Sequence, residues 1–283
     1  MKFALVAAAM IGSTNAWFGT GHLLVARVAF DILTKESPDQ LAKAESILKQ
    51  MSDYETQHLE KNHPFVECAT YADAFKYHGG IYQKTWHFVD QPLLDEGGTI
   101  SDFPKFVPDT HSAVEALNGL IAWMNDPSAT NYPVTTTVAD TKGGRSAAYG
   151  TALRLIIHYA GDIHQPLHAT ARVNHEYPAG DRGGNSVYLP SKEGVRNLHA
   201  SWDSVEYEFS GYAKLPFSTT GWNTNGSRAA AMVSNHPVSS LNGDITDLNP
   251  QVWADSSFAI SKEFVYNGVK SGQSLTSDYV SKG

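Results

Sequence analysis

The chain is poor in cysteine and in charge. A single cysteine, Cys68, occurs among 283 residues, which excludes an intrachain disulfide and any zinc finger built on cysteine ligands. Charged residues make up 18% of the sequence, and 21 Lys and Arg against 29 Asp and Glu leave a formal charge of −8. This balance argues against a protein that binds nucleic acid through a basic face. It does not exclude phosphate binding through metal, because a bound cation can be the largest local charge in a site.

Histidine and apolar residues are plentiful by comparison. The 12 histidines outnumber the arginines, and hydrophobic residues make up 42% of the chain, enough for a buried core. The length is long for one domain and short for two, and the sequence contains no repeat and no linker that would separate two cores. We therefore expect one ordered domain whose chemistry depends on histidine.

The first sixteen residues are typical of a secretory signal peptide. Lys2 gives a positive start, residues 3–11 are apolar but too few to span a bilayer, and small residues precede a cleavage site after Ala16. A buried first helix is the alternative interpretation. Cleavage would leave Trp17 as the amino terminus, and the remaining chain contains no other long apolar run. We expect export without a membrane anchor, either secretion or delivery to the lumen of a secretory or lysosome-like compartment.

Helical patterns dominate the remaining sequence. Apolar spacing, capping residues and prolines predict helices at residues 22–33, 37–51, 111–124, 147–164, 197–209 and 250–269. Segments rich in Gly, Pro, Asn and Ser are interpreted as loops at 89–110, 125–146, 170–196 and 210–249, the last with a glycosylation sequon at Asn225. Only residues 134–138 have strand character. The sequence predicts a single all-α domain with long functional loops.

Histidine and aspartate recur four residues apart, a spacing that places both on one face of a helix. His158 and Asp162 form one such pair, and His199 and Asp203 form another. His168 follows just beyond the end of the helix that carries the first pair. Imidazole and carboxylate at this spacing can chelate a divalent cation, although a single pair is equally well explained by an ion pair on a solvated face. Two pairs with a third histidine nearby predict a metal site.

Three residues nearer the amino terminus could join this site. Asp73 and His87 lie in aromatic contexts, where each alone is better explained as a helix-capping aspartate or a core histidine. His22 lies five residues after Trp17, and two glycines between them would let the segment fold back. The free α-amine of a cleaved chain could then lie beside His22.

The order of these motifs resembles the zinc-dependent S1/P1 nuclease family. The segments that carry the resemblance are Trp17…Gly21-His22, Ala72-Asp73, His87-Phe88-Val89-Asp90, His158 to His168, Gly183-Gly184-Asn185 and Asn197 to Asp203. They extend over essentially all of residues 17–283. The resemblance implies a mainly helical catalytic domain, shared in fold with zinc-dependent phospholipase C, that holds three zinc ions. Family members are usually disulfide-bonded, and this chain departs from them in that respect.

Carried over position by position, the resemblance implies nine metal ligands. One zinc ion would be held by Asp73, His87, His158 and Asp162, and a second by His168, His199 and Asp203. The third would be held by the α-amine and carbonyl of Trp17, by His22, and by the second oxygen of Asp162. Asp90 matches a carboxylate near the attacking water, while Phe88 and Asn185 match positions at the nucleotide-binding cleft.

The function implied by the resemblance is hydrolysis of single-stranded DNA and RNA to 5′-nucleotides, with 3′-nucleotidase activity as an extension. Metal-activated hydroxide would attack phosphorus, and Asp90 would orient the water or accept its proton. Three zinc ions against three aspartates would also form a strong anion site inside an acidic protein. A zinc-dependent phospholipase C acting on phospholipid headgroups and a non-enzymatic zinc-binding protein are the alternatives. No motif implies a protein partner.

Overall fold

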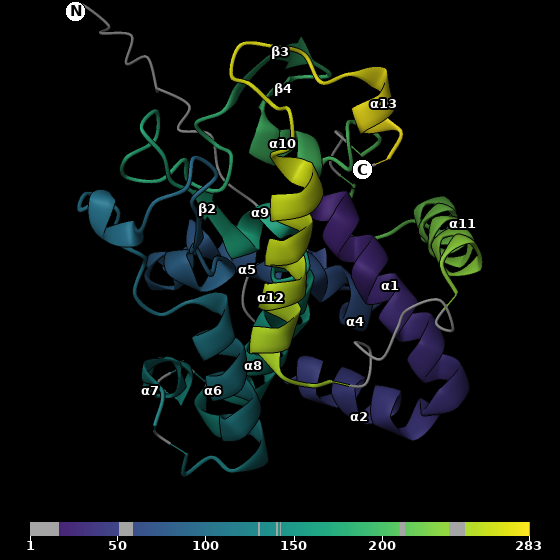
Figure 1. Ribbon diagram of the computed structural model, residues 1–283. Coiled ribbons are helices and arrows are strands. Elements are labelled where there is room, and N and C mark those ends of the chain that lie inside the picture. Colours follow the sequence, from purple (N-terminus) through teal and green to yellow (C-terminus); the bar gives the residue numbers. More distant parts are fainter. Residues whose placement is uncertain are drawn as a thin grey trace, which may run out of the picture.

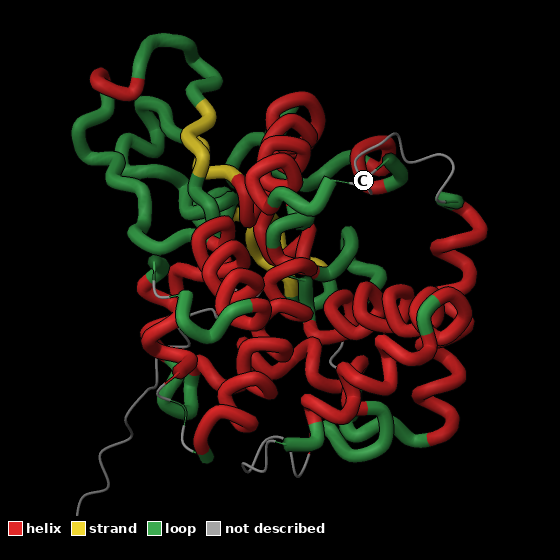
Figure 2. The backbone as a smooth tube through the Cα atoms, turned by 90° about the horizontal axis from the view of Figure 1, so that it is seen from below, coloured by secondary structure: helices red, strands yellow, loops and turns green. Residues whose placement is uncertain are grey.

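The computed structural model describes residues 17–50, 59–129, 131–139, 141, 143–209, 213–237 and 247–282. The predicted signal peptide, residues 1–16, lies outside the described residues. Helices account for most of the described chain, and the short strands lie among long loops (Figures 1 and 2). The mainly helical class expected from the sequence is confirmed. No helix in the described ranges combines the length and apolar character needed to cross a bilayer.

The α-helices follow one another in chain order. They are α1 (Gly19–Glu36), α2 (Pro38–Leu48), α4 (Pro64–Glu67), α5 (Tyr71–Lys76), α6 (Ala113–Asn125), α7 (Pro133–Ala139), α8 (Gly144–Asp162), α9 (Pro166–Ala169), α10 (Leu198–Asp203), α11 (Thr219–Asn235), α12 (Pro250–Ile260) and α13 (Ser277–Val280). Shorter 3₁₀ segments are η1 (Cys68–Thr70), η2 (Ile81–His87) and η3 (Ile100–Asp102). A π-helical turn, η6 (Ser261–Val265), continues α12.

The strands form two small two-stranded sheets. β1 (Gln91–Leu93) pairs in parallel with β2 (Thr170–Arg172), with Gln91 opposite Thr170. β3 (Tyr188–Lys192) pairs antiparallel with β4 (Val195–Asn197). Both sheets lie within or beside segments that the sequence identified as loops. Three-residue strands give too little alternation to be recognised before their partners are known.

Helix α8 forms the centre of the molecule. It contacts α1, α2, α5, α6, α7, η1 and η2, and its small residues let these neighbours approach closely. Gly161 illustrates the requirement, because a Cβ at this position would lie 3.0 Å from Nδ1 of His22 on α1. One core cluster joins α6, α7 and α8, and a second joins α1, α2, α4 and η1. The last turn of α8 is thereby fixed between both clusters.

Three local predictions were wrong. Residues 134–138 are helical, because Val134 and Val138 lie four residues apart and both bury their side chains in the core with α6 and α8. Burial on one helix face here outweighs the strand preference of β-branched residues. The predicted helix 197–209 ends at Asp203, since Val205, Glu206 and Tyr207 all have positive φ, at 50°, 54° and 80°.

The third error concerns residues 210–249, interpreted as a loop. They include the seventeen-residue helix α11, whose polar composition hides it from periodicity. Ser218 caps its amino terminus by accepting a hydrogen bond from the Gly221 amide, and α11 packs along α1. Asn225 of the sequon therefore lies on a helix and is only 5% exposed.

Candidate metal centre

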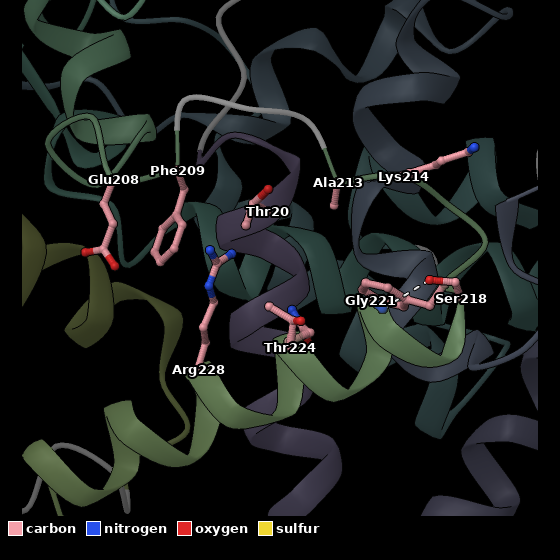
Figure 3. Close-up of a pocket in the computed structure, with 11 residues that line it drawn as sticks. Thr20, Glu208, Phe209, Ala213, Lys214, Ser218, Gly221, Thr224 and Arg228 are labelled. Atoms are coloured by element: carbon pink, nitrogen blue, oxygen red, sulfur yellow. Dashed lines mark hydrogen bonds between the residues drawn. The ribbon is translucent and has the colours of Figure 1, made fainter.

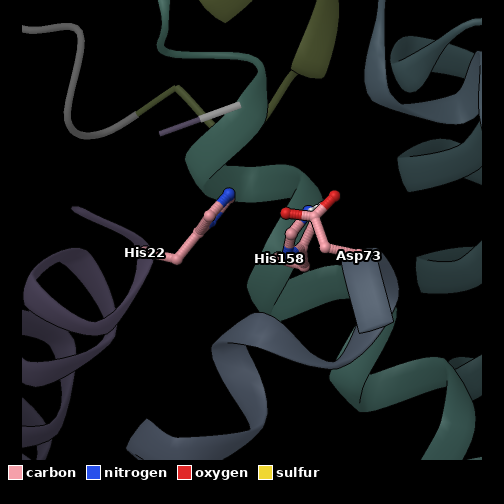
Figure 4. Close-up of side chains that lie close together, drawn as sticks. All are labelled: His22, Asp73 and His158. Carbon is pink, nitrogen blue, oxygen red and sulfur yellow. Dashed lines mark ion pairs between the residues drawn. The ribbon is translucent and has the colours of Figure 1, made fainter. Parts of the chain in front are cut away.

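The first group of candidate ligands is His22, Asp73 and His158, which come from α1, α5 and α8. Their ligand atoms lie within 4.8 Å of one another, and Figure 4 shows the three side chains converging. His158 Nε2 is 3.8 Å from Asp73 Oδ1. The rings of His22 and His158 stack with centroids 3.9 Å apart. Residues 85 and 136 positions apart in these pairs are thus brought together by the packing of α1 and α5 on α8.

Asp162, at the last residue of α8, joins this group to a second one. Its Oδ2 atom lies 2.7 Å from His87 Nδ1 and 3.3 Å from His158 Nε2, while Oδ1 lies 3.3 Å from His22 Nε2. The carboxylate is fully buried. Its two oxygens therefore face different histidines, the arrangement required of a carboxylate that bridges two cations.

The third group is His168, His199 and Asp203, at α9 and α10. The Nε2 atoms of His168 and His199 are 3.1 Å apart, and His199 Nε2 is 3.4 Å from Asp203 Oδ2. The Nδ1 atoms contact the main-chain oxygens of His87 (2.7 Å) and Gly183 (2.6 Å). A carbonyl can only accept a hydrogen bond, so each Nδ1 donates its proton.

These tautomers test whether the residues fit a metal. With the proton on Nδ1, the neutral rings of His168 and His199 direct two lone pairs at one another, which a cation between them would satisfy. His158 has the same tautomer, because its Nδ1 donates to the Ala69 carbonyl at 2.6 Å. In addition, Nε2 of His22 and Oδ1 of Asp162 are buried without an interaction of hydrogen-bond geometry among the described residues. Such atoms are costly unless something binds them.

Burial sets the protonation of this centre. It lowers the pKa of His87 and of His199 to about 4, and it lowers the pKa of His168 well below its usual range. For His158, the attraction of Asp162 and Asp73 outweighs burial and raises the pKa. Three of these rings are therefore neutral at pH 7, which is the form that ligates a metal.

Trp17 lies against the same centre. Its indole Nε1 donates to the Gly161 carbonyl at 3.0 Å, and the Phe18 amide donates to the Asp203 carbonyl at 2.7 Å. Gly21 permits this fold-back, since a Cβ there would meet Trp17 Cβ at 2.6 Å. The structure brings the nine residues carried over by resemblance to one region; their role as zinc ligands stays a prediction.

A pocket of about 260 Å³ adjoins the centre and contains the remaining candidate residues. Phe88, Asp90 and Asn185 all line it. Phe88 stacks on His168 with centroids 4.4 Å apart. Burial and the neighbouring Asp109 and Asp181 raise the pKa of Asp90 to about 6. Aromatic, carboxyl and amide groups together are suited to holding a nucleobase.

The sequence model of the S1/P1 nuclease family matches residues 17–283. This chain belongs to the S1/P1 nuclease family. It is 25% identical to Nuclease S1 of Aspergillus oryzae (strain ATCC 42149 / RIB 40) over 193 residues, or 68% of this chain and 54% of that protein. It is 23% identical to Endonuclease 1 of Arabidopsis thaliana over 283 residues, covering 95% and 80%. Nuclease P1 of Penicillium citrinum is 24% identical over 189 residues, covering 66% and 57%. The matched region thus spans little more than half of the two fungal nucleases.

Sequence reasoning missed two polar residues of this chain that support the candidate ligands. Gln165 donates from Nε2 to Asp203 Oδ1 at 2.7 Å, and it is fully buried. Lys76 is 6% exposed, and its Nζ lies 3.2 Å from Asp73 Oδ1. The spacing of Lys76, three residues after Asp73 on α5, was the only signal of its position. Nothing in the sequence connects Gln165 to Asp203.

A second hollow of this family member, about 380 Å³, lies between α1 and α11 (Figure 3). The Arg228 guanidinium lies 4.8 Å from the centre of the Phe209 ring, and Asn225 also lines the hollow. None of the three metal-ligand groups of the described residues belongs to it.

Proposed function

We propose that this chain is a zinc-dependent phosphodiesterase that hydrolyses single-stranded DNA and RNA to 5′-nucleotides, with 3′-nucleotidase activity at the same site. The observation that carries the proposal is the approach of the Nε2 atoms of His168 and His199, whose lone pairs face each other at 3.1 Å. The carboxylate of Asp162 adds to it, because its two oxygens face different histidines, His22 and His87. Membership of the S1/P1 nuclease family supports the reaction class.

The proposed ligands divide into three sites. Asp73, His87, His158 and Asp162 hold one zinc ion, while His168, His199 and Asp203 hold the second. Trp17, His22 and Asp162 hold the third. Bound there, zinc supplies Lewis acidity toward phosphate oxygens and lowers the pKa of water to near neutrality. The chain itself fixes the ligand geometry, because main-chain carbonyls hold the Nδ1 protons of His158, His168 and His199.

The pocket beside the centre orients the substrate. Phe88 has one face against His168 and lines the pocket with its ring, so a splayed base can stack there. Bases in a duplex are already stacked and paired, which favours single strands as substrates. Asn185 donates from Nδ2 to the Arg182 carbonyl at 2.8 Å, which fixes its side chain at the pocket wall. Above pH 6 the carboxylate of Asp90 is ionised and can accept a proton.

The deciding experiment uses protein beginning at Trp17, single-stranded DNA, and a chelator in parallel reactions. We expect chelator-sensitive release of nucleotides, and mass analysis is expected to find phosphate on their 5′ ends. Ends carrying 3′-phosphate would refute the proposed bond cleavage. A zinc-loaded protein that releases nothing from DNA or RNA would refute the nuclease function.

The same protein distinguishes the phospholipase alternative. Phosphatidylcholine vesicles should give no headgroup release under conditions in which DNA is hydrolysed. The named relatives are nucleases and endonucleases, which favours nuclease activity over phospholipase activity. Headgroup release without nucleotide release would reverse it.

We also propose that the protein is exported after removal of residues 1–16. Cleavage after Ala16 would free the α-amine of Trp17, the residue whose indole already contacts the carbonyl next to Asp162. Mass spectrometry of protein recovered from the culture medium should give Trp17 as the first residue. Intact residues 1–16 in functional protein would refute both the cleavage and the amine ligand.

A further inference from the structure

Two cations, Lys84 and Arg182, line the pocket that adjoins the metal centre. Both residues are exposed. The Lys and Arg ion pairs found among the described residues involve Arg27, Lys76, Arg154, Arg172 and Lys282 instead. The charges of Lys84 and Arg182 are therefore available to an anion that enters the pocket, within a protein whose overall charge is −8.

Lys84 lies on η2, the segment that also carries His87 of one metal-ligand group. A 3₁₀ helix has three residues per turn and rises about 2 Å per residue. Lys84 and His87 consequently lie on the same face of η2, one turn apart. His87 in turn contacts Asp162 at 2.7 Å.

Arg182 lies beside the group of His168, His199 and Asp203. It precedes Gly183, whose carbonyl accepts the Nδ1 proton of His199 at 2.6 Å. Its own backbone is held at a φ of 61°, and Asn185 donates to its carbonyl. The two cations therefore stand on segments that each position a histidine of a different group.

The acidic residues of the pocket decide where phosphate can bind. Asp90 and Asp109 also line it, and each raises the cost of placing an anion nearby. Only the positions of Lys84 and Arg182 offer positive charge within the lining. The scissile phosphate belongs at the metal centre, so these cations are free to bind other phosphates of the same strand.

We propose that Lys84 and Arg182 bind the backbone phosphates next to the scissile one, and that the enzyme thereby prefers oligonucleotides to substrates with a single phosphate. This rests on the proposed nuclease function. The preference comes from electrostatic attraction to the strand and is independent of base sequence.

The kinetic test compares three thymidine dinucleotides: one with only the internal phosphate, one with an added 5′-phosphate and one with an added 3′-phosphate. We expect at least one added phosphate to raise kcat/KM for internal cleavage about fivefold, the upper range of an exposed ion pair. Lys84→Gln and Arg182→Gln should each reduce that gain. In both variants the loss of kcat/KM on the phosphorylated dinucleotides should exceed the loss on the unmodified dinucleotide, because neither side chain is assigned to the scissile phosphate.

A binding test removes catalysis altogether. Fluorescence anisotropy of a labelled oligothymidylate, measured at several salt concentrations with zinc-loaded protein that carries Asp90→Asn to stop hydrolysis, gives the slope of log affinity against log salt. Each removed phosphate contact should reduce the magnitude of this slope by about 0.7. The matched control is the double variant Lys43→Gln/Lys49→Gln, which changes the net charge as much as the two test variants combined; neither lysine lines the pocket.

The outcomes separate the two proposals. Equal gains from added phosphate in wild type and both variants, or unchanged salt slopes, would overturn the role of Lys84 and Arg182 while leaving the nuclease intact. Zinc-loaded wild type that cleaves none of the dinucleotides or longer strands would refute the nuclease function, and the salt slopes would still decide the phosphate contacts. Because both side chains are exposed, melting temperatures should match the wild type.

Discussion

His168 and His199 face each other through Nε2 atoms 3.1 Å apart, while each ring donates its Nδ1 proton to a main-chain carbonyl. Neither ring can turn away without losing that hydrogen bond. The backbone therefore holds two imidazole acceptors in a repulsive arrangement, which a cation would convert into an attractive one. This relationship underlies the first two predictions.

Removing metal should destabilise the protein. A cation that binds the folded state and not the unfolded state adds stability according to its affinity and concentration. We expect chelator to lower the melting temperature and zinc to restore it, while magnesium restores less because imidazole prefers zinc. Identical melting curves with and without chelator, at confirmed zinc loading beforehand, would contradict the metal centre.

Replacing Gln165 should weaken metal binding without removing a ligand. Gln165→Ala deletes the hydrogen bond to Asp203 Oδ1 and frees the carboxylate to rotate. Loss of such a supporting contact typically lowers metal affinity about 10- to 100-fold. Competition with a zinc indicator measures it. Gln251→Ala, which removes an exposed hydrogen bond to Asp255, is the control and should leave zinc affinity unchanged.

Glu206 should make stability fall as pH rises. Burial raises the pKa of its carboxyl to about 7 from an ordinary value of 4.5, and neither oxygen has a hydrogen-bond partner among the described residues. Between pH 4.5 and 7 the folded state keeps a proton that the unfolded state releases, so each rise in pH favours unfolding.

The variant Glu206→Gln removes this titration. It should be more stable than wild type at pH 8, by about 1 kcal/mol after allowance for solvent screening. The two proteins should converge near pH 4, where the carboxyl is protonated in both states. Urea unfolding at the two pH values measures the difference, and a difference that does not change with pH would count against the buried charge.

Gly183 should tolerate no side chain. A Cβ would lie 2.3 Å from the Leu167 carbonyl oxygen, and φ is +59°. Gly183→Ala should therefore cost about 3 kcal/mol or more and displace the carbonyl that orients His199. Gly194→Ala is the matched control, since its φ is +82° but nothing lies within 4 Å; it should cost only about 1 kcal/mol. Equal losses of unfolding free energy would show that the clash is relieved elsewhere.

Retaining a residue before Trp17 should reduce metal content. An extra peptide bond removes the α-amine as a ligand, so protein that begins at Ala16 should bind one zinc ion fewer than protein that begins at Trp17. Metal analysis after gel filtration gives the stoichiometry. The same zinc content in both proteins would exclude the amine from the centre.

The sequence by itself determined the chemistry of the candidate centre. Spacing of four residues put His158 with Asp162, and His199 with Asp203, on single helix faces, because the period of an α-helix is fixed by local backbone geometry. The mainly helical class followed from the same periodicity. These properties depend on neighbours within one or two turns, so a sequence displays them directly.

Only the tertiary structure decided how these parts meet. Gln165 reaches Asp203, and Gly161 leaves room for His22, because separate helices pack at particular angles and depths. Helix α11 and the helical form of residues 134–138 likewise depend on burial against α1, α6 and α8, which overrides local preference. Lys84 and Arg182, nearly a hundred residues apart, share a pocket for the same reason. Long-range packing is a property of the whole chain, and no local pattern encodes it.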